Sequence, residues 1–552
     1  MIPGYISCAL RLRQMNGWGV SCLPIIYAIA RLSILRNSLN FQKTYQRDDR
    51  AKRLPQIFNI QYSIPVSPGW GDSKEMAKKI TIIGGGPGGY VAAIRSAQLG
   101  SEVTLIEEDS VGGTCLNRGC IPSKVMKRTA EILNDFKRAQ EFGISVKGVI
   151  HPDMKALMAK KETVISNQVK GIHKLLDHNK VRLLKGHAHL RSPHLVEVKL
   201  ENGRTVEVLW DRLILAMGSR PLNIPSFPFD GSKVISSNEA LNLQEIPESM
   251  LIVGGGVIGC EFGFIFSSLG SKVTIVEAMD RLLPIPSVDN DCSKVIQREM
   301  KKRKIDFMVN RTVERVEKDG GKTCVTIGPS HFGGQLNEKQ LTPLTLETDK
   351  VLVCIGREPN TAHVGMEKLG IKTDKKGWIF ADEQMQTNIP GVYAVGDVLG
   401  PSKIMLAHVA SKEGLVAAEN TMDGRMEMDY NVAPGAIFTM PEVACVGLTE
   451  IEAKERGYDI RADRVLFRNL GKAHVIGEIA GEAKIISEAG DGRILGVHMV
   501  GPHVTDLIAE ATLAMNRECT VKQLAETLHP HPTLSEVMFE VALKALDRSL
   551  HG

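Results

Sequence analysis

The chain has 552 residues, of which 43% are hydrophobic and 24% charged, a composition typical of globular proteins and long enough for several domains. Its formal net charge is +5, but the first 75 residues hold ten Lys or Arg and only four Asp or Glu. The rest of the chain therefore carries a net charge of −1, which argues against a nucleic-acid partner.

Residues 1–75 form an N-terminal extension with three possible origins. They contain no apolar stretch of the roughly 20 residues that cross a bilayer, so we expect no membrane span. Arg11 and Arg13 precede an apolar run at 20–30, as in a secretory signal, whereas the lack of acids in 1–47 is typical of a transit peptide. Alternatively, translation begins at Met76. We expect a cytoplasmic protein, or a mitochondrial matrix protein if the extension is a transit peptide.

A dinucleotide-binding motif follows the extension directly. The apolar run 78–83 predicts a strand, a glycine-rich turn and a helix come next, and a second strand at 102–107 ends in Glu107. The glycines of the turn are Gly84, Gly86 and Gly89. This spacing permits a tight turn, a close approach of backbone to pyrophosphate, and close packing of helix on strand. Glu107 is placed to accept hydrogen bonds from a ribose.

The same motif occurs a second time, so the sequence predicts two nucleotides. A strand at 250–253 leads into Gly254, Gly256 and Gly259, and a strand at 272–276 is followed by Glu277. A carboxylate accepts hydrogen bonds from a free ribose 2′-OH and repels a 2′-phosphate, so Glu277 favours NAD over NADP. We interpret the nearby Arg281 as a solvated side chain.

Cys115 and Cys120 lie in the run 112–124, and the other eight of the ten cysteines are scattered singly. This excludes a disulfide scaffold and a four-cysteine zinc site, and no metal site is predicted. Two such cysteines on a straight helix would rise about 7.5 Å, but Gly119 and Pro122 can distort the turn. A strained disulfide beside a nucleotide site indicates redox function; the alternative is two unpaired buried cysteines.

The run GGTCLNRGCIPSK resembles the active-site segment of the FAD-dependent pyridine nucleotide–disulfide oxidoreductases, most closely of those that oxidise dihydrolipoamide. The resemblance implies FAD at the first site and NAD at the second. It also implies that Cys115 exchanges with substrate, and that Cys120 is the flavin-side thiolate. Lys124 would lie near the flavin and pair with Glu261, which we assign to the second nucleotide motif.

Further nucleotide contacts are implied by the resemblance alone. For FAD they are Ala188, Gly218, Asp397, Met405, Ala407 and His408, and for NAD they are Val313 and Gly356. Met217 stands where the family usually has Thr, which removes a hydroxyl near the FAD. The segment 211–221 matches a strand that crosses between the two nucleotide domains, and 353–360 matches the return crossing.

His531 and Glu536 form the predicted acid–base pair near the C-terminus. Pro530 and Pro532 restrict the backbone around His531, and Glu536 can turn back to orient the imidazole. On the residues alone, a helix-capping histidine is the preferred interpretation. The run resembles the family's HAHPTLSE, with Pro530 in place of Ala, and the resemblance implies that this pair enters the partner subunit's site in a homodimer. His529 would then have a supporting role.

The predicted fold is α/β, with two Rossmann-like nucleotide domains and an α+β dimerisation domain. We expect the FAD domain at 76–225, the NAD domain at 226–350, a segment that returns to FAD at 351–425 and the dimerisation domain at 426–552. The resemblance implies a flavoprotein that oxidises dihydrolipoamide with NAD+. Its partners would be lipoyl-bearing domains of an E2 acyltransferase or of the glycine cleavage H protein. Alternatives are a glutathione-type or mercuric-type disulfide reductase, or a non-catalytic nucleotide-binding scaffold.

Overall fold

The computed structural model describes residues 77–319, 321–332 and 336–552. The three interpretations of the extension at 1–75 therefore lie outside the described residues. The rest of the chain, from Met76 to Gly552, forms a single compact unit. Among the described helices, none has the length and hydrophobicity required to span a membrane.

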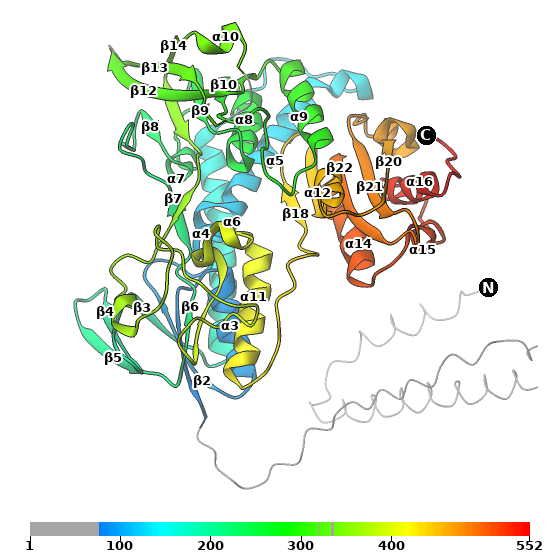
Figure 1. Ribbon diagram of the computed structural model, residues 1–552. Helices are drawn as coiled ribbons and strands as arrows, with labels where there is room; N and C mark the ends of the chain where they lie inside the picture. The colour runs from blue at the N-terminus through cyan, green and yellow to red at the C-terminus, as the bar shows by residue number, and fades with distance from the viewer. Residues whose placement is uncertain (1–76, 320, 333–335) are drawn as a thin grey trace, which may run out of the picture. The chain divides into compact units, whose positions relative to one another are not determined.

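A seven-stranded sheet organises the first nucleotide domain (Figure 1). Its strands, in spatial order, are β17 (Val392–Ala394), β6 (Arg212–Leu215), β1 (Lys79–Ile83), β2 (Glu102–Glu107), β3 (Arg182–Ser192), β4 (Leu195–Leu200) and β5 (Thr205–Leu209). The strands from β17 to β3 are parallel, whereas β3, β4 and β5 form an antiparallel meander. Because β17 joins from the distant segment after residue 390, this part of the chain returns to the first domain.

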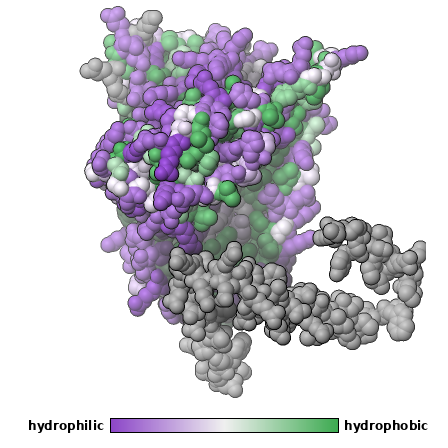
Figure 2. All heavy atoms as spheres, turned by 90° about the vertical axis from the view of Figure 1, so that its right-hand side faces the viewer, coloured by the Kyte–Doolittle hydropathy of each residue, from purple (hydrophilic) through white to green (hydrophobic). Residues whose placement is uncertain are grey.

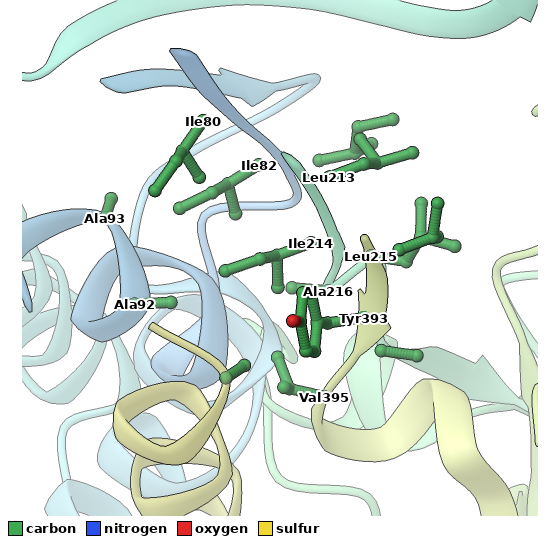
Figure 3. Close-up of a cluster of buried hydrophobic side chains, with 14 of the residues drawn as sticks. Ile80, Ile82, Ala92, Ala93, Leu213, Ile214, Leu215, Ala216, Tyr393 and Val395 are labelled. Carbon is green, nitrogen blue, oxygen red and sulfur yellow. The ribbon is translucent and has the colours of Figure 1, made fainter. Parts of the chain in front are cut away.

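Helices cover the parallel part of this sheet, which is why its strands are apolar on both faces. The helices and 3-10 turns of this part are α3 (Pro87–Gln98), α4 (Gly113–Arg118), α5 (Cys120–Lys137), η2 (Ala139–Phe142), α6 (Met154–His178), η3 (Met366–Leu369), η4 (Gly396–Ser402) and α11 (Ala407–Thr421). Figure 3 shows the core between sheet and helices, where Ile82 and Ile214 from neighbouring strands lie close to Ala92 of α3. All three side chains are fully buried.

A parallel five-stranded sheet forms the second nucleotide domain. Its strands in order are β11 (Asp306–Met308), β10 (Lys272–Val276), β9 (Ser249–Val253), β15 (Lys350–Val353) and β8 (Val234–Ile235). Its helices are α7 (Ser237–Ala240), α8 (Val257–Leu269) and α9 (Asn290–Lys302). An antiparallel sheet of β12 (Arg311–Asp319), β13 (Lys322–Pro329) and β14 (Leu344–Thr348), with α10 (Glu338–Leu341), extends this domain.

The predicted crossing strand at 211–221 is two strands rather than one. The chain leaves β6 after Leu215, passes through Gly218 with φ +67°, and forms β7 (Ser219–Pro221) in a separate sheet. There β7 pairs antiparallel with β16 (Arg357–Pro359), which belongs to the return crossing. The two crossings therefore support each other as a two-stranded link between the nucleotide domains.

The C-terminal domain is an antiparallel sheet covered by short helices. In spatial order its strands are β18 (Gly435–Ile437), β19 (Glu442–Gly447), β22 (Ile494–Gly501), β21 (Glu482–Glu488) and β20 (Ile460–Leu466). Its helices are α12 (Glu450–Glu455), η5 (Phe467–Asn469), α13 (Gly471–Val475), α14 (Val504–Asn516), α15 (Val521–Ala525) and α16 (Glu536–Ala545). Figure 2 shows that hydrophobic side chains interrupt the hydrophilic surface on this side of the molecule. Large hydrophobic side chains exposed in this domain include Val475, Leu513 and Leu528.

Candidate redox active site

The first glycine-rich loop has the backbone that its sequence predicts. Gly84 has φ +101°. A Cβ on Gly89 would lie 1.8 Å from the Gly84 carbonyl oxygen, so the first turn of α3 can pack against the loop only because residue 89 has no side chain. No side chain caps α3, which leaves its first N–H groups free to bind phosphate. The Gly85 N–H donates to Glu107 Oε2 at 2.6 Å. The carboxylate at the end of β2 thus lies against the loop.

A cavity of about 450 Å³ opens at the ends of β1 and β2 and beside the middle of β3. Four residues singled out from the sequence line it, namely Gly84, Glu107, Ala188 and Met217. The lining also includes Arg220, Asn360 and His363, which the sequence analysis did not predict. An uncapped helix N-terminus, a carboxylate and a mostly neutral wall suit the phosphate, ribose and adenine of a dinucleotide, so FAD fits these residues.

The Met217 departure leaves a backbone contact in place. The Asn360 side-chain amide donates to the Met217 carbonyl at 3.0 Å, and the Asn360 N–H donates to the Gly218 carbonyl at 3.1 Å. These bonds hold the crossing in position without the hydroxyl that the family usually has. Asn360 lies in the return crossing, but its partner is more than 140 residues away, so no local pattern could have indicated it.

The second loop repeats the first. Gly254 has φ +101°, α8 has no side-chain cap, and the Gly255 N–H donates to Glu277 Oε2 at 2.6 Å. Glu277 is buried, and its Oε1 accepts from the Met279 N–H at 2.8 Å. NAD therefore fits this loop in the way that FAD fits the first.

Arg281 is not the solvated side chain that we expected. Its guanidinium donates to Ser293 Oγ at 2.6 Å and to the carbonyls of Ile285 and Val288 at 3.2 and 3.1 Å. The loop 285–288 folds back over the side chain and supplies acceptors that have no sequence signature. The arginine is thus held by this loop rather than free beside Glu277.

The other residues implied for FAD lie on three segments. Asp397, in η4, accepts from Ser219 Oγ at 2.6 Å, and Arg357 Nε lies 3.6 Å from the same carboxylate. Ala407 is the first residue of α11, and Met405 precedes it. His408 follows in α11, and its Nε2 lies 2.8 Å from the Pro434 carbonyl oxygen.

The two remaining residues implied for NAD lie at either side of the second sheet. Val313 is buried in β12, beside a β-bulge. Gly356 has φ +131° and separates β15 from β16. Val313 therefore lies in the second nucleotide domain, and Gly356 lies where the chain leaves that domain.

The cysteine pair lies across a break between two helices. α4 ends at Arg118, Gly119 has φ −147° and ψ −111°, and α5 begins at Cys120. A Cβ on Gly119 would lie 2.8 Å from the Thr114 carbonyl oxygen. The break replaces the straight helix that would hold the cysteines too far apart, and the two sulfurs share a hydrogen bond.

The two thiols differ in acidity although they are neighbours. The hydrogen bond from Cys115, opposed by burial and aided by the positive charge of Lys124, lowers the pKa of Cys120 to about 7. The same hydrogen bond, together with burial, raises the pKa of Cys115. Both cysteines are free thiols in this structure. The proton of the pair is therefore favoured on Cys115, and the negative charge on Cys120.

The predicted Lys124–Glu261 ion pair is present. Lys124 Nζ lies 2.9 and 3.1 Å from the two carboxylate oxygens, and the Glu261 side chain is only 9% exposed. Cys120 and Lys124 are four residues apart on α5 and so share one face of the helix. The sequence analysis could place this pair only through the family resemblance, because 137 residues separate its members.

His531 and Glu536 are also in contact, with Nδ1 of the imidazole 2.8 Å from Oε1. The Thr533 N–H donates to the other carboxylate oxygen at 2.9 Å, and the His531 side chain is 76% exposed. His529 is buried instead and pairs with Glu510 at 2.8 Å. Figure 1 shows α16, which begins at Glu536, well apart from α4 of the same chain, which contains Cys115.

Comparison with known proteins identifies the family. Residues 78–414 match the pyridine nucleotide-disulphide oxidoreductase family, and residues 433–542 match its dimerisation domain. The chain belongs to the pyridine nucleotide-disulphide oxidoreductases. The predicted α/β fold is thereby confirmed, and the chain is an oxidoreductase that uses FAD and NAD.

Several relatives within the family are closely similar. A dihydrolipoyl dehydrogenase from Chlamydia muridarum is 42% identical over 85% of this chain and 97% of its own length. One from Bacillus subtilis is 37% identical over 86% of this chain and 100% of its own length. The crystal structure of LpdA from Mycobacterium tuberculosis superposes with a TM-score of 0.77 at 27% identity, covering 85% of this chain and 99% of that one. The matched dimerisation domain supports a homodimer.

Proposed function

We propose that this oxidoreductase converts dihydrolipoyl groups, carried on protein partners, to the lipoyl disulfide with NAD+ as the final acceptor. The central observation is the thiol–thiolate pair of Cys115 and Cys120 beside the Lys124–Glu261 ion pair. The names of the relatives, dihydrolipoyl dehydrogenases that align over nearly their whole length, support the choice of substrate.

The cysteine chemistry is a pair of thiol–disulfide exchanges. One substrate thiol loses its proton, and its sulfur attacks Cys115 of the oxidised pair. The bond between Cys115 and Cys120 breaks, and Cys120 leaves as a thiolate. The second substrate thiol then attacks the sulfur of the substrate in the mixed disulfide and closes the lipoyl ring, and its proton passes to Cys115 as that sulfur is released. The substrate has lost two electrons, and the cysteine pair has gained them.

His531 is the base in this proposal. A substrate thiol must be a thiolate to attack, and an imidazole whose Nδ1 is held by Glu536 can accept the proton at Nε2. Because α16, which begins at Glu536, lies apart from α4, which contains Cys115, we assign the His531–Glu536 pair to the site of the partner subunit. The exposure of His531 is in keeping with a residue that acts across a subunit interface.

The nucleotides are held by the two glycine loops. Glu107 and Glu277 would bind the two riboses, and the uncapped starts of α3 and α8 would bind the phosphates. Bound FAD supplies the electron transfer between the cysteine pair and the nicotinamide. Glu277 favours NAD over NADP, and with it a dihydrolipoyl substrate over the NADP-dependent reduction of glutathione.

We further infer the partners and the compartment. The partners are lipoyl-bearing domains of an E2 acyltransferase or of the glycine cleavage H protein. The compartment is the cytoplasm, or the mitochondrial matrix if residues 1–75 are a transit peptide. Mass spectrometry of the native N-terminus decides between these compartments, since a cleaved extension would overturn the cytoplasmic assignment.

A spectrum of the purified protein tests the proposal. We expect a yellow protein that gains a long-wavelength charge-transfer band when NADH is added anaerobically, because a Cys120 thiolate would donate charge to bound FAD. A Cys120→Ser variant should remain yellow and form no such band. A colourless protein, or an unchanged band in the variant, would contradict the proposed redox pair.

A further inference from the structure

Phe438 is an aromatic residue at the start of the C-terminal domain that contacts the redox site in two ways. It directly follows β18 and lies against α5 and α8. Its N–H donates to Glu261 Oε1 at 2.9 Å, and its ring centroid lies 4.3 Å from Lys124 Nζ. One residue of the C-terminal domain thus touches both members of the ion pair.

The two contacts restrain the Lys124 ammonium in different ways, one through Glu261 and one directly. The backbone N–H fixes the carboxylate, which accepts two hydrogen bonds from Lys124. The ring face attracts the cation that those bonds leave partly exposed, and a desolvated cation–π contact is stronger than an exposed one. Without the ring, the flexible lysine side chain can turn toward solvent.

A second lysine does not compete for this ring. Lys127 lies one turn further along α5, 5.6 Å from the Phe438 centroid. Its ammonium is held by Glu131 at 2.6 Å and by Glu442 at 2.7 Å. The ring therefore acts mainly on Lys124.

We propose that Phe438 is a positioning residue of the redox site, whose ring keeps the Lys124 ammonium on the face of α5 that carries Cys120. Through this contact the C-terminal domain sets the acidity of a thiol in the first nucleotide domain. The proposal rests on the assigned roles of Cys120 and Lys124, but not on the identity of the dithiol substrate.

The charged groups that face Cys120 come from four elements. They are Cys115 of α4, Lys124 of α5, Glu261 of α8 and Arg357 of β16. Lys124 lowers the pKa of the thiol and Glu261 opposes it. A change at the Phe438 ring alters only the position of the lysine, because the backbone bond to Glu261 remains.

The test measures the alkylation of Cys120 as a function of pH. In a Cys115→Ser holoenzyme, iodoacetamide is applied from pH 5 to 10 and the rate at Cys120 is read by peptide mass spectrometry. Phe438→Leu should move the midpoint up by about half a pH unit, a three-fold loss of thiolate well below the midpoint. Phe438→Tyr, which keeps the ring face, should retain the midpoint of the parent. An unchanged midpoint in the leucine variant, or equal shifts in both, would overturn the proposal.

A double-mutant cycle separates positioning from a general structural effect. If Phe438 acts through Lys124, then Phe438→Leu should shift the midpoint by less than about 0.1 unit in a Lys124→Met background. If Phe438→Leu shifts the midpoint as much with Lys124→Met as it does with Lys124 intact, the proposal is contradicted. If the leucine variant does not fold, Phe438→Met replaces it in the same cycle. The readout does not depend on dihydrolipoyl turnover, so its failure is distinct from failure of the proposed function.

Discussion

Cys115 and Cys120 show how environment divides two identical side chains into two roles. One hydrogen bond, with burial around it, raises the pKa of Cys115 and lowers that of Cys120 to about 7. The first thiol is therefore suited to exchange with substrate after attack on its sulfur, whereas the second ionises more readily and forms a thiolate as the pH rises through about 7. The division depends on the helix break at Gly119, because only the break brings the two sulfurs together.

Replacement of Cys115 by Ser should separate the two half-reactions. We expect dihydrolipoamide turnover to fall by at least about 1,000-fold, because Cys115 is the thiol assigned to form the mixed disulfide. NADH-driven dye reduction should persist, since it needs only the nucleotide sites. Cys519→Ser, at a partly exposed cysteine in the C-terminal domain, serves as the control with normal turnover. Steady-state assays of both activities check this, and retained lipoamide turnover would overturn the assigned roles.

Local patterns in the sequence could predict the glycine loops and their acids, because each motif spans only about 25 residues and its physics is local. Contacts between distant segments were beyond such reasoning. Arg281 donates hydrogen bonds to backbone carbonyls, which have no sequence signature. Asn360 and Phe438 donate hydrogen bonds to residues that lie far away along the chain. The contact between Lys124 and Glu261 was anticipated through a family resemblance rather than through spacing.

At the scale of elements, the first nucleotide site depends on the close packing of α3 and α11. A Cβ on Gly414 of α11 would lie 2.3 Å from the Gly88 carbonyl oxygen of α3. Both helices begin next to predicted FAD contacts, at Pro87 and Ala407. Their separation therefore sets the width of the site.

Gly414→Ala should lower the free energy of unfolding by about 2–3 kcal/mol, since the contact is with backbone and overpacking forces the helices apart. It should also weaken retention of FAD. The matched control is Gly171→Ala in α6, where an added Cβ meets nothing within 4 Å; removal of a helix glycine there should stabilise by about 0.5–1 kcal/mol. Denaturant unfolding and the flavin-to-protein ratio measure both effects. Equal outcomes for the two variants would refute the packing argument.

A buried charge cluster joins α9 to the C-terminal sheet. Lys484 Nζ lies 2.9 Å from Asp289, 2.6 Å from Asp291 and 3.0 Å from Glu450, and its side chain is 4% exposed. Although burial opposes it, hydrogen bonds from Lys484 and Lys294 lower the pKa of Asp291 to about 2. A carboxyl with a depressed pKa adds stability above its unfolded pKa and loses it as the pH falls through the folded pKa. This contribution should therefore disappear between about pH 4 and pH 2.

Lys484→Met should destabilise the protein by about 3–5 kcal/mol, because it leaves buried carboxylates without their cation. It should also weaken the loss of stability on acidification from pH 4 to pH 2. The control is Lys454→Met, which removes an ion pair to the same Glu450 from a side chain that is 61% exposed, and should change stability by less than about 1 kcal/mol. Urea unfolding at several pH values measures the free energy of unfolding of both variants. A Lys484 variant as stable as the control would show that the cluster does not hold α9.

At the scale of the whole molecule, the account requires two chains for each site. The dimerisation domain supports a homodimer, and α16, which begins at Glu536, lies apart from the Cys115 helix α4 within a chain. A shared site makes a prediction that no single-chain site makes, because two different inactive chains can complement each other.

A heterodimer of a Cys115→Ser chain and a His531→Gln chain should regain about half of the wild-type turnover. One of its two sites then combines an intact Cys115 with an intact His531 from the other chain, whereas both homodimers lack an intact site. Two different affinity tags allow purification of the heterodimer. If both groups acted within one chain, the heterodimer would be as inactive as the homodimers.

The measurement that tests the central claim most directly is a substrate matrix on the purified holoenzyme. Dihydrolipoamide is assayed with NAD+ and with NADP+, and oxidised glutathione and dyes are each assayed with NADH and with NADPH. The account predicts rapid NADH formation from dihydrolipoamide and NAD+, a rate with NADP+ lower by at least about 100-fold because Glu277 repels a 2′-phosphate, and no turnover of glutathione. Turnover of glutathione with NADP(H), or no NADH from dihydrolipoamide, would contradict it.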